Sequence, residues 1–323
     1  MLSLEFEKFK RVRRWCQAWT IILLLILFLI GYFFVNIFPV KYSNILVQNQ
    51  NLLIGFIGVC IVVVCLYVVL TYFCIIKPRK KYSNYYKEYF VLKALKQSFT
   101  NVIYKPEAGV SKKTITDTGV IYTGDRFTSN DYISGKYKGV KFRQSDVKME
   151  KEMHIYMSTE DDISELTYYV TLFKGRWMVF DFNKNFKANV CIYENGFLNK
   201  RINSIFSSVK YKKVNLESRE FNNDFNVYAV NEEDAFYIIT PHFMEKISKL
   251  NDMCSGKLIL CFINNQLHVG LYNNDDAFEA PNYFRIFSKK SAIKSIDKDI
   301  KLITMFVDEL ELDNDLFKSK NVN

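Results

Sequence analysis

The sequence predicts an α+β membrane protein, in which a two-helix transmembrane hairpin precedes a cytoplasmic domain with a mainly antiparallel sheet and a C-terminal helix. Three observations lead to this fold class. Two long apolar runs lie near the N-terminus, short alternating segments follow from residue 104 onward, and the last segment carries apolar residues at helical spacing.

The first apolar run, residues 19–38, is 20 residues long, which lets a helix cross about 30 Å of hydrocarbon. Its basic flank also fits a cleaved signal peptide, but the run is too long for one, and no small-residue cleavage site follows Gly31. The second run, residues 52–76, has 25 residues, and Pro78 is expected to end its helix sharply. We therefore predict two membrane spans.

The basic residues predict the orientation of these spans. Five precede the first span and four follow the second, whereas the loop between them carries one, Lys41. The positive-inside rule then predicts a multi-pass protein of the cell membrane with both termini in the cytoplasm. Residues 1–81 would form the membrane anchor and residues 82–323 the cytoplasmic domain. The membrane-flanking basic residues are Lys8, Lys10, Arg11, Arg13, Arg14, Lys77, Arg79, Lys80 and Lys81.

The net charge of +10 is concentrated beside the spans, because residues 1–81 hold ten basic residues against two acids. The remaining domain is nearly neutral, which excludes the strongly basic surface typical of nucleic-acid binding. The seven cysteines include no CxxC pair and give no disulfide framework, as is usual in a reducing compartment.

Hydrophobic periodicity predicts the elements of the cytoplasmic domain. The clearest is a hairpin with an Asn264-Asn265 turn, which would place Cys261 opposite His268. The C-terminal helix is expected to pack on its own sheet, and a dimerising coil, hence a homo-oligomer, is the alternative. In chain order we expect a helix at 85–99, strands within 104–152, a three-strand meander at 166–173, 176–182 and 187–193 with a turn at Lys174-Gly175, a strand at 225–230, a helix at 240–252, a hairpin at 257–263 and 266–272, and a helix at 291–312.

Three blocks carry a resemblance to a known family: GVIYTGDRFTSNDYISGKYKGVKFRQSDVKME (119–150), LFKGRWMVFDFNKNF (172–186) and YIITPHFMEKISKLNDMCSGKLILCFINNQLHVGL (237–271). In these blocks the chain resembles an uncharacterised bacterial family, known only as a domain of unknown function, with two N-terminal spans ahead of a cytoplasmic α+β domain. The resemblance implies this architecture, and the family offers no catalytic residues to carry over.

Two sequence patterns resemble sites that carry chemistry. Asp181-x-Asn183-x-Asn185 opens like a calcium-binding loop, but Phe186 and Ile192 stand where that loop needs glycine and a bidentate glutamate, so we predict a hairpin turn. Cys261 and His268 could form a nucleophile pair, but no residue is placed to orient the imidazole, so ordinary cross-strand neighbours are expected. The sequence therefore predicts no catalytic residue, no metal and no cofactor.

One short basic stretch stands out in the domain: Lys136, Lys138, Lys141 and Arg143. A solvated strand is expected there, with contact to anionic lipid headgroups or another anionic partner as the alternative. Alternation would place the first two residues on one face and the last two on the other, unless a bulge at Gly139 brings them together.

Taken together, these features favour a non-enzymatic, membrane-anchored interaction or scaffolding module. Its domain would bind an unknown protein partner or contact lipid of the inner leaflet. The alternative is an enzyme of unrecognised type that acts on a membrane-proximal substrate through the Asp/Asn-rich turns. A two-span pore is disfavoured, because neither span carries a polar lining.

Overall fold

The computed structural model describes residues 2–33, 36, 50–158, 163–181, 189–197, 211–263, 265–282, 284 and 289–313. The chain forms two compact units. One consists of Met1–Val91 with Glu279–Ile293, and the other of Leu92–Phe278 with Lys294–Asn323.

The N-terminal unit is built from two long helices. The first is α1 (Leu2–Tyr32), and the second runs without a break through α4 (Gln50–Thr71), η2 (Tyr72–Ile76), α5 (Lys77–Tyr86) and η3 (Lys87–Val91). The helical stretches Glu7–Tyr32 and Ile54–Ser98 are long and apolar enough to cross a membrane. The loop predicted between the spans and the end of the first span lie outside the described residues, apart from Asn36.

The expected sharp helix end at Pro78 is wrong. The residues Tyr72–Ile76 adopt a π-helical turn, in which the Lys77 N–H donates to the Tyr72 carbonyl. A wider turn of this kind accommodates a proline, whose ring would otherwise clash with the preceding carbonyls and which offers no N–H of its own. Pro78 therefore sits in the first turn of α5. The helix expected at 85–99 is present as the end of α5, η3 and α6 (Leu92–Ser98), which follow one another without a break.

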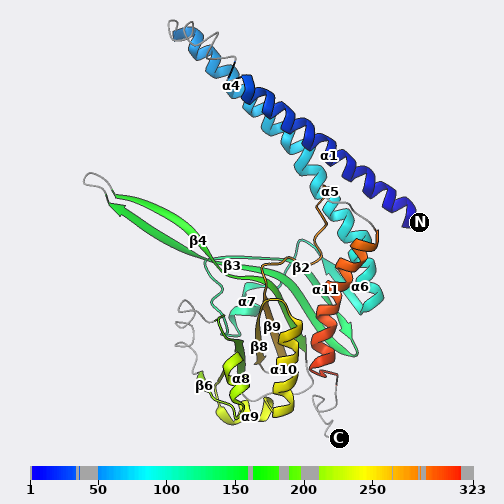
Figure 1. The fold of residues 1–323 in the computed structure, drawn as a ribbon, viewed down its shortest axis with the longest axis vertical. Helices are drawn as coiled ribbons and strands as arrows, with labels where there is room; N and C mark the ends of the chain where they lie inside the picture. The colour runs from blue at the N-terminus through cyan, green and yellow to red at the C-terminus, as the bar shows by residue number, and fades with distance from the viewer. Residues whose placement is uncertain are drawn as a thin grey trace. The chain divides into compact units, whose positions relative to one another are not determined.

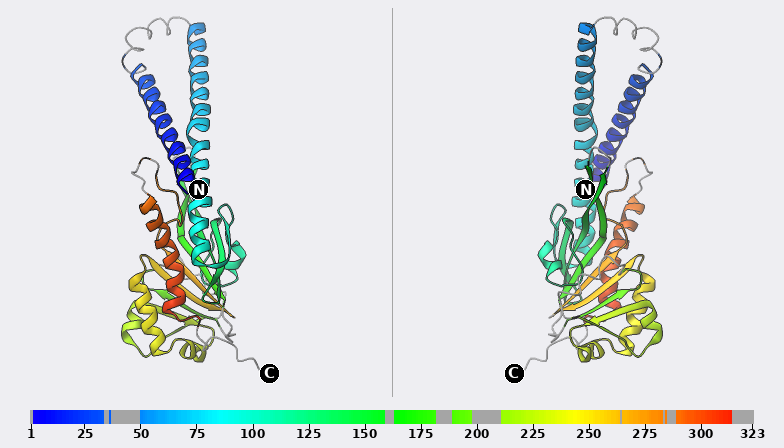
Figure 2. Two further views of the ribbon diagram at one scale, coloured as in Figure 1. Left: turned by 90° about the vertical axis from the view of Figure 1, so that its right-hand side faces the viewer. Right: turned by 90° about the vertical axis from the view of Figure 1, so that its left-hand side faces the viewer.

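The two helices of the N-terminal unit meet beside the start of α1. The Phe9 ring stacks on Tyr82 at 4.5 Å between centroids and meets Phe90 edge-on at 5.6 Å. All three rings are buried, and the helices diverge toward the other end of the unit (Figure 2). Because α1 has 31 residues, about 46 Å of helix, it extends well beyond the predicted span in the N-terminal direction.

The second unit is an α+β domain built on one nine-stranded antiparallel sheet, in the order β1-β2-β3-β4-β9-β8-β5-β7-β6 (Figure 1). Its strands are β1 (Thr100–Lys105), β2 (Arg126–Tyr137), β3 (Val140–Ser158), β4 (Ile163–Asp181), β5 (Val190–Glu194), β6 (Lys212–Val214), β7 (Phe225–Ala229), β8 (Lys257–Ile263) and β9 (Gln266–Tyr272). Its helices are α6, α7 (Lys112–Thr116), α8 (Arg219–Asp224), α9 (Glu232–Ile238), α10 (Pro241–Met253) and most of α11 (Lys289–Glu309).

Helices cover both faces of this sheet. On one face, Phe243 of α10 packs against Phe262, and Phe306 of α11 against Phe180. On the other face, the core around the fully buried Trp177 includes Ile115 of α7. The prediction that the C-terminal helix packs on its own sheet is therefore confirmed.

Several predicted elements are confirmed. The hairpin strands β8 and β9 have the expected bounds and register, with Leu260 opposite Val269 and both fully buried. The helix α10 begins as expected, because the Thr240 hydroxyl accepts from the Phe243 N–H and Pro241 occupies the first turn.

The predicted three-strand meander is wrong. Lys174 and Gly175 form no turn; they lie inside β4, which runs unbroken through 19 residues. Glycine is required there because a Cβ at Gly175 would overlap the carbonyl oxygen of Leu271 in β9. The third predicted strand, β5, pairs with β7 and β8 rather than with β4, because the β8–β9 hairpin lies between them.

The region from 104 to 152 differs in two further ways. It contains the short helix α7, capped by the Ser111 hydroxyl, where only strands were expected. It also contains the long strand β2 and the start of the long strand β3, which are joined by a two-residue turn at Lys138-Gly139. Both turn residues have positive φ, 47° and 84°, as a tight hairpin turn requires.

Candidate functional site

The β3–β4 ribbon extends beyond the rest of the sheet. β2 pairs with β3 only as far as Glu150, and β9 pairs with β4 only from Gly175 onward. From the Lys151–Val170 pair outward, no other described strand pairs with β3 or β4. This two-stranded projection, residues 151–158 and 163–170, is called the arm below and is plain in Figure 1.

One face of the arm is apolar. Residues paired across an antiparallel ribbon share a face, so the pairs Met153–Tyr168 and Ile155–Leu166 lie on the same side. Met157 continues this side toward the end of β3, and Val170 borders it near the sheet. All except the half-buried Val170 are exposed, so a continuous apolar strip faces outward among the described residues.

The opposite face of the arm is polar and internally paired. His154 lies between two acids, 2.6 Å from Glu165 and 3.5 Å from Glu152. The Tyr169 hydroxyl donates to Glu152 at 3.2 Å, and the Arg126 guanidinium stacks 4.4 Å above the Tyr169 ring. The arm is therefore amphipathic across its thickness, and the ion pairs of His154 and the hydrogen bond of Tyr169 lie on its polar side.

The sequence of the arm and of the segment that joins its two strands is acidic, and the arm itself holds Glu152 and Glu165 against Lys151. The sequence from 151 to 170 contains five Asp or Glu residues against one lysine. An isolated two-stranded hairpin has marginal stability in water, and an exposed apolar face on it marks a contact surface. The arm thus combines an exposed apolar face with a surrounding sequence of negative charge.

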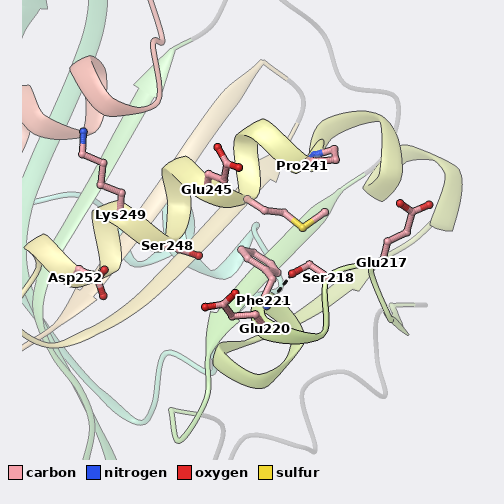
Figure 3. A pocket seen from close by; sticks show the side chains of 10 residues that line it. Glu217, Ser218, Glu220, Phe221, Pro241, Glu245, Ser248, Lys249 and Asp252 are labelled. Carbon is pink, nitrogen blue, oxygen red and sulfur yellow. Dashed lines mark hydrogen bonds between the residues drawn. The ribbon is translucent and has the colours of Figure 1, made fainter.

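A second candidate site is a cleft of about 670 Å³ between α8 and α10 (Figure 3). Phe221 and Met244 form its apolar floor, and Lys249 at its rim pairs with Glu309 at 2.7 Å. Four acids line it: Glu217, Glu220, Glu245 and Asp252. No His or Cys lines the cleft, and the described part of the chain holds no group of three His, Cys, Asp or Glu placed to bind a metal ion.

A buried ionic cluster lies within the sheet domain. Arg176 of β4 pairs with Asp299 of α11, whose other oxygen accepts from the Phe278 N–H at 3.0 Å. Asp146, directly opposite Arg176 on β3, accepts from the Ala277 N–H at 2.6 Å. Burial raises the pKa of Asp146 to about 8, and the nearby Arg176 opposes this rise. The cluster holds the segment after β9 and α11 on the sheet.

The four basic residues expected on a solvated strand, with lipid contact as the alternative, lie on the β2–β3 hairpin rather than on one strand. Lys138 in the turn pairs with Asp308 at 2.7 Å, and Arg143 lies 3.8 Å from Asp181. Lys136 and Lys141 are opposite each other in the register. Among the described residues, neither of these two has an acid within 4.0 Å, so the hairpin gathers two uncompensated charges where four were expected.

The membrane-flanking basic residues all lie within helices. Lys8, Lys10, Arg11, Arg13 and Arg14 belong to α1, and Lys77, Arg79, Lys80 and Lys81 to α5. Lys10 pairs with Glu7 one turn away, at 2.9 Å. Both groups lie in the N-terminal unit, where α1 and α5 run side by side (Figure 2).

The pair Cys261 and His268 is opposed across β8 and β9, as predicted. Cys261, however, forms a disulfide with Cys191, so the expectation that the cysteines make no disulfide is wrong for this pair. The sequence could not reveal it, because only the sheet order brings β5 beside β8. His268 is buried and accepts from the Trp177 Nε1–H at 3.4 Å, and burial, aided by Arg143, lowers its pKa to about 4.

In the calcium-like loop, Asp181 ends β4 and accepts from the Gln266 side-chain amide at 2.8 Å. Asn183 and Asn185 lie outside the described residues. The predicted hairpin turn in that segment therefore stays a prediction.

Sequence reasoning missed the arm, although its signal was present. We ended one strand at 152 and began the next at 166, whereas Met153, Ile155 and Met157 continue the alternation of β3. Leu166, Tyr168 and Val170 repeat the same period on β4, where the sequence predicts the first strand of the meander.

Comparisons with known proteins give little about function. No curated protein matches the chain. Among solved structures, the chain is similar to the crystal structure of the mycobacterial trehalose monomycolate transport factor A, TtfA, at 12% identity and a TM-score of 0.35, over 65% of this chain and 88% of that chain. A similarity this loose carries no argument. A family model described as "Protein of unknown function (DUF3137)" matches residues 171–312, from the base of the arm through the acidic cleft to α11, so a DUF3137 domain of unknown function covers that stretch.

Proposed function

We propose that this chain is a membrane-anchored interaction module, in which the α1 and α4 helices span the membrane and the α+β domain presents the arm to a protein partner. The observation that carries the proposal is the apolar strip around Ile155 and Leu166 on an unsupported ribbon. Such a strip is costly to leave in water, at roughly 25 cal/mol per Å² of apolar surface.

The partner fits best as a different protein whose docking face is apolar and bordered by Lys or Arg. The segment 151–170 carries five acids against one lysine, so anionic lipid would repel it, and two identical segments would repel one another. A partner strand could also pair with either edge of the arm, because beyond Lys151 and Val170 no described strand occupies those edges.

Site-specific photo-cross-linking in native membranes tests this proposal. A photoreactive residue replaces Leu166 on the apolar face or its neighbour Thr167 on the polar face. We expect a discrete cross-linked protein from position 166 only, lost when Ile155 is changed to Ser in the same chain. Cross-links of a second copy of the chain, of lipid, or of equal yield from both positions would contradict the proposed partner.

Contact with the inner leaflet is part of the same proposal and depends on Lys136 and Lys141. Each basic residue near an anionic surface contributes about 1 kcal/mol, so two of them would bias orientation without anchoring the domain. A photoreactive residue in place of Ser134, which shares a face with both lysines, should form lipid adducts in native membranes, and its failure to do so would remove the leaflet from the account.

The cytoplasmic location of the domain follows from the distribution of basic residues and belongs to the proposal. The rival function, an enzyme acting through the Asp/Asn-rich turns, gains no specific support from the described residues.

A further inference from the structure

The N-terminal unit contains a cleft of its own, of about 340 Å³, between α5 and the segment 279–284. From α5 it is lined by Arg79, Tyr82 and Ser83, which share one helix face because they are three and four residues apart. From the other side it is lined by Glu279, Ala280, Pro281, Asn282 and Phe284.

This cleft is held open by two contacts. The buried Tyr82 donates its hydroxyl to the Pro281 carbonyl at 2.9 Å, which fixes the segment against α5. Glu279, the one acid in the lining, pairs with the buried Lys87 at 2.8 Å. Its charge is thereby compensated, whereas the exposed Arg79 has no acid within 4.0 Å in the described part of the chain.

We propose that this cleft binds the phosphate group of an anionic ligand, with an anionic phospholipid headgroup as the source that its position favours. The Arg79 guanidinium offers a planar fork of donors matched to phosphate oxygens, and the Ser83 hydroxyl and the Asn282 amide add neutral donors. The exposed Phe284 ring supplies an apolar wall beside them.

The choice of lipid rests on the proposed function, because it requires the membrane span. Arg79 follows the end of the apolar run at Ile76 by three residues, about 4.5 Å along a helix. If the apolar run crosses the hydrocarbon, Arg79 therefore lies at the depth of the lipid headgroups. The other basic residues of α5 would also attract anionic lipid by their charge alone. Arg79 differs from them because it acts within the cleft.

Native mass spectrometry of the full-length protein in detergent tests the claim. The protein is titrated with phosphatidylglycerol, with phosphatidylcholine and with inorganic phosphate. The variant is Arg79→Gln, and the matched control is Lys81→Gln, which removes the same charge from the same helix at a residue outside the cleft. We expect Arg79→Gln to weaken phosphatidylglycerol binding by roughly five- to tenfold, and Lys81→Gln to change it by less than about twofold.

Three outcomes overturn the inference: equal losses in both variants, no loss in either, or phosphatidylcholine binding as tightly as phosphatidylglycerol. Inorganic phosphate that binds and depends on Arg79 would keep the site and assign it to a soluble anion. Carbonate extraction of native membranes checks the anchor separately. Protein that remains in the pellet while the lipid experiment fails rejects the cleft alone, and protein that is extracted rejects the anchor.

Discussion

Ile155 and Leu166 lie directly opposite each other across the arm, and their side chains are 44% and 52% exposed. In the body of the sheet, apolar cross-strand pairs of these two strands, such as Met149 and Phe173, are fully buried. The same strands thus provide a packed core at one end and a bare apolar face at the other. This contrast is the structural basis for treating the arm as a binding element.

The buried ion pair predicts a large effect on stability. Changing Arg176 to Met leaves Asp299 buried without its counter-charge, which we expect to cost about 3–5 kcal/mol in the free energy of unfolding. The exposed pair of Lys113 and Asp117 is the control, and Lys113→Ala should cost only about 0.3–0.5 kcal/mol. Urea unfolding of the full chain in detergent measures both. Equal costs would mean that the buried pair has no structural role.

His268 predicts a pH dependence. Its pKa is lowered to about 4 in the folded protein, chiefly by burial and further by Arg143, against about 6.5 when unfolded. Between these values only the unfolded chain takes up the proton, so stability falls as pH drops from about 6.5 to about 4. Urea unfolding should show the wild type losing about 2 kcal/mol more than His268→Gln between pH 7 and pH 5. The exposed His242→Gln variant is the control and should follow the wild type.

The topology predicts selective thiol labelling. A cysteine in place of Ser43, between the two spans, should react with a membrane-impermeant maleimide in intact cells, and one in place of Ser319 only after lysis. The Cys191–Cys261 disulfide argues the other way, because disulfides persist in oxidising compartments. Labelling at position 319 in intact cells would reverse the orientation and place the domain outside.

Local signals in the sequence predict part of this fold well. The β8–β9 hairpin and α10 were predicted because their turn residues, cap and alternation are contiguous in the chain. The sequence misled at Lys174-Gly175, since a glycine needed for close approach to Leu271 looks the same as a turn glycine. Pro78 was misleading in a similar way. A proline that ends a helix looks the same in the sequence as one that a preceding π-helical turn accommodates.

The candidate sites were harder to predict because they depend on long-range neighbours. The apolar alternation of β3 and β4 is readable, but its exposure follows from where β2 and β9 stop pairing. The cleft beside Arg79 depends on Tyr82 contacting Pro281, residues almost 200 positions apart. Two of the four basic residues, Lys138 and Arg143, are compensated by Asp308 of α11 and Asp181 of β4. Only the folded structure brings these acids close to them.

The most direct test of the account compares two neighbouring residues on opposite faces of the arm. Met157 lies on the apolar face and Tyr156 on the polar face, and their side chains are 51% and 68% exposed. Each is replaced by cysteine in the full-length protein, and the rate of maleimide labelling is measured in native membrane vesicles, opened so that both sides are accessible, and again after purification in detergent. If a partner covers the apolar face, labelling at 157 is slow in native membranes and becomes fast on purification, while labelling at 156 is fast in both. Equal rates at 157 and 156 in native membranes would show that the apolar face is bare, and would contradict the proposed interaction module.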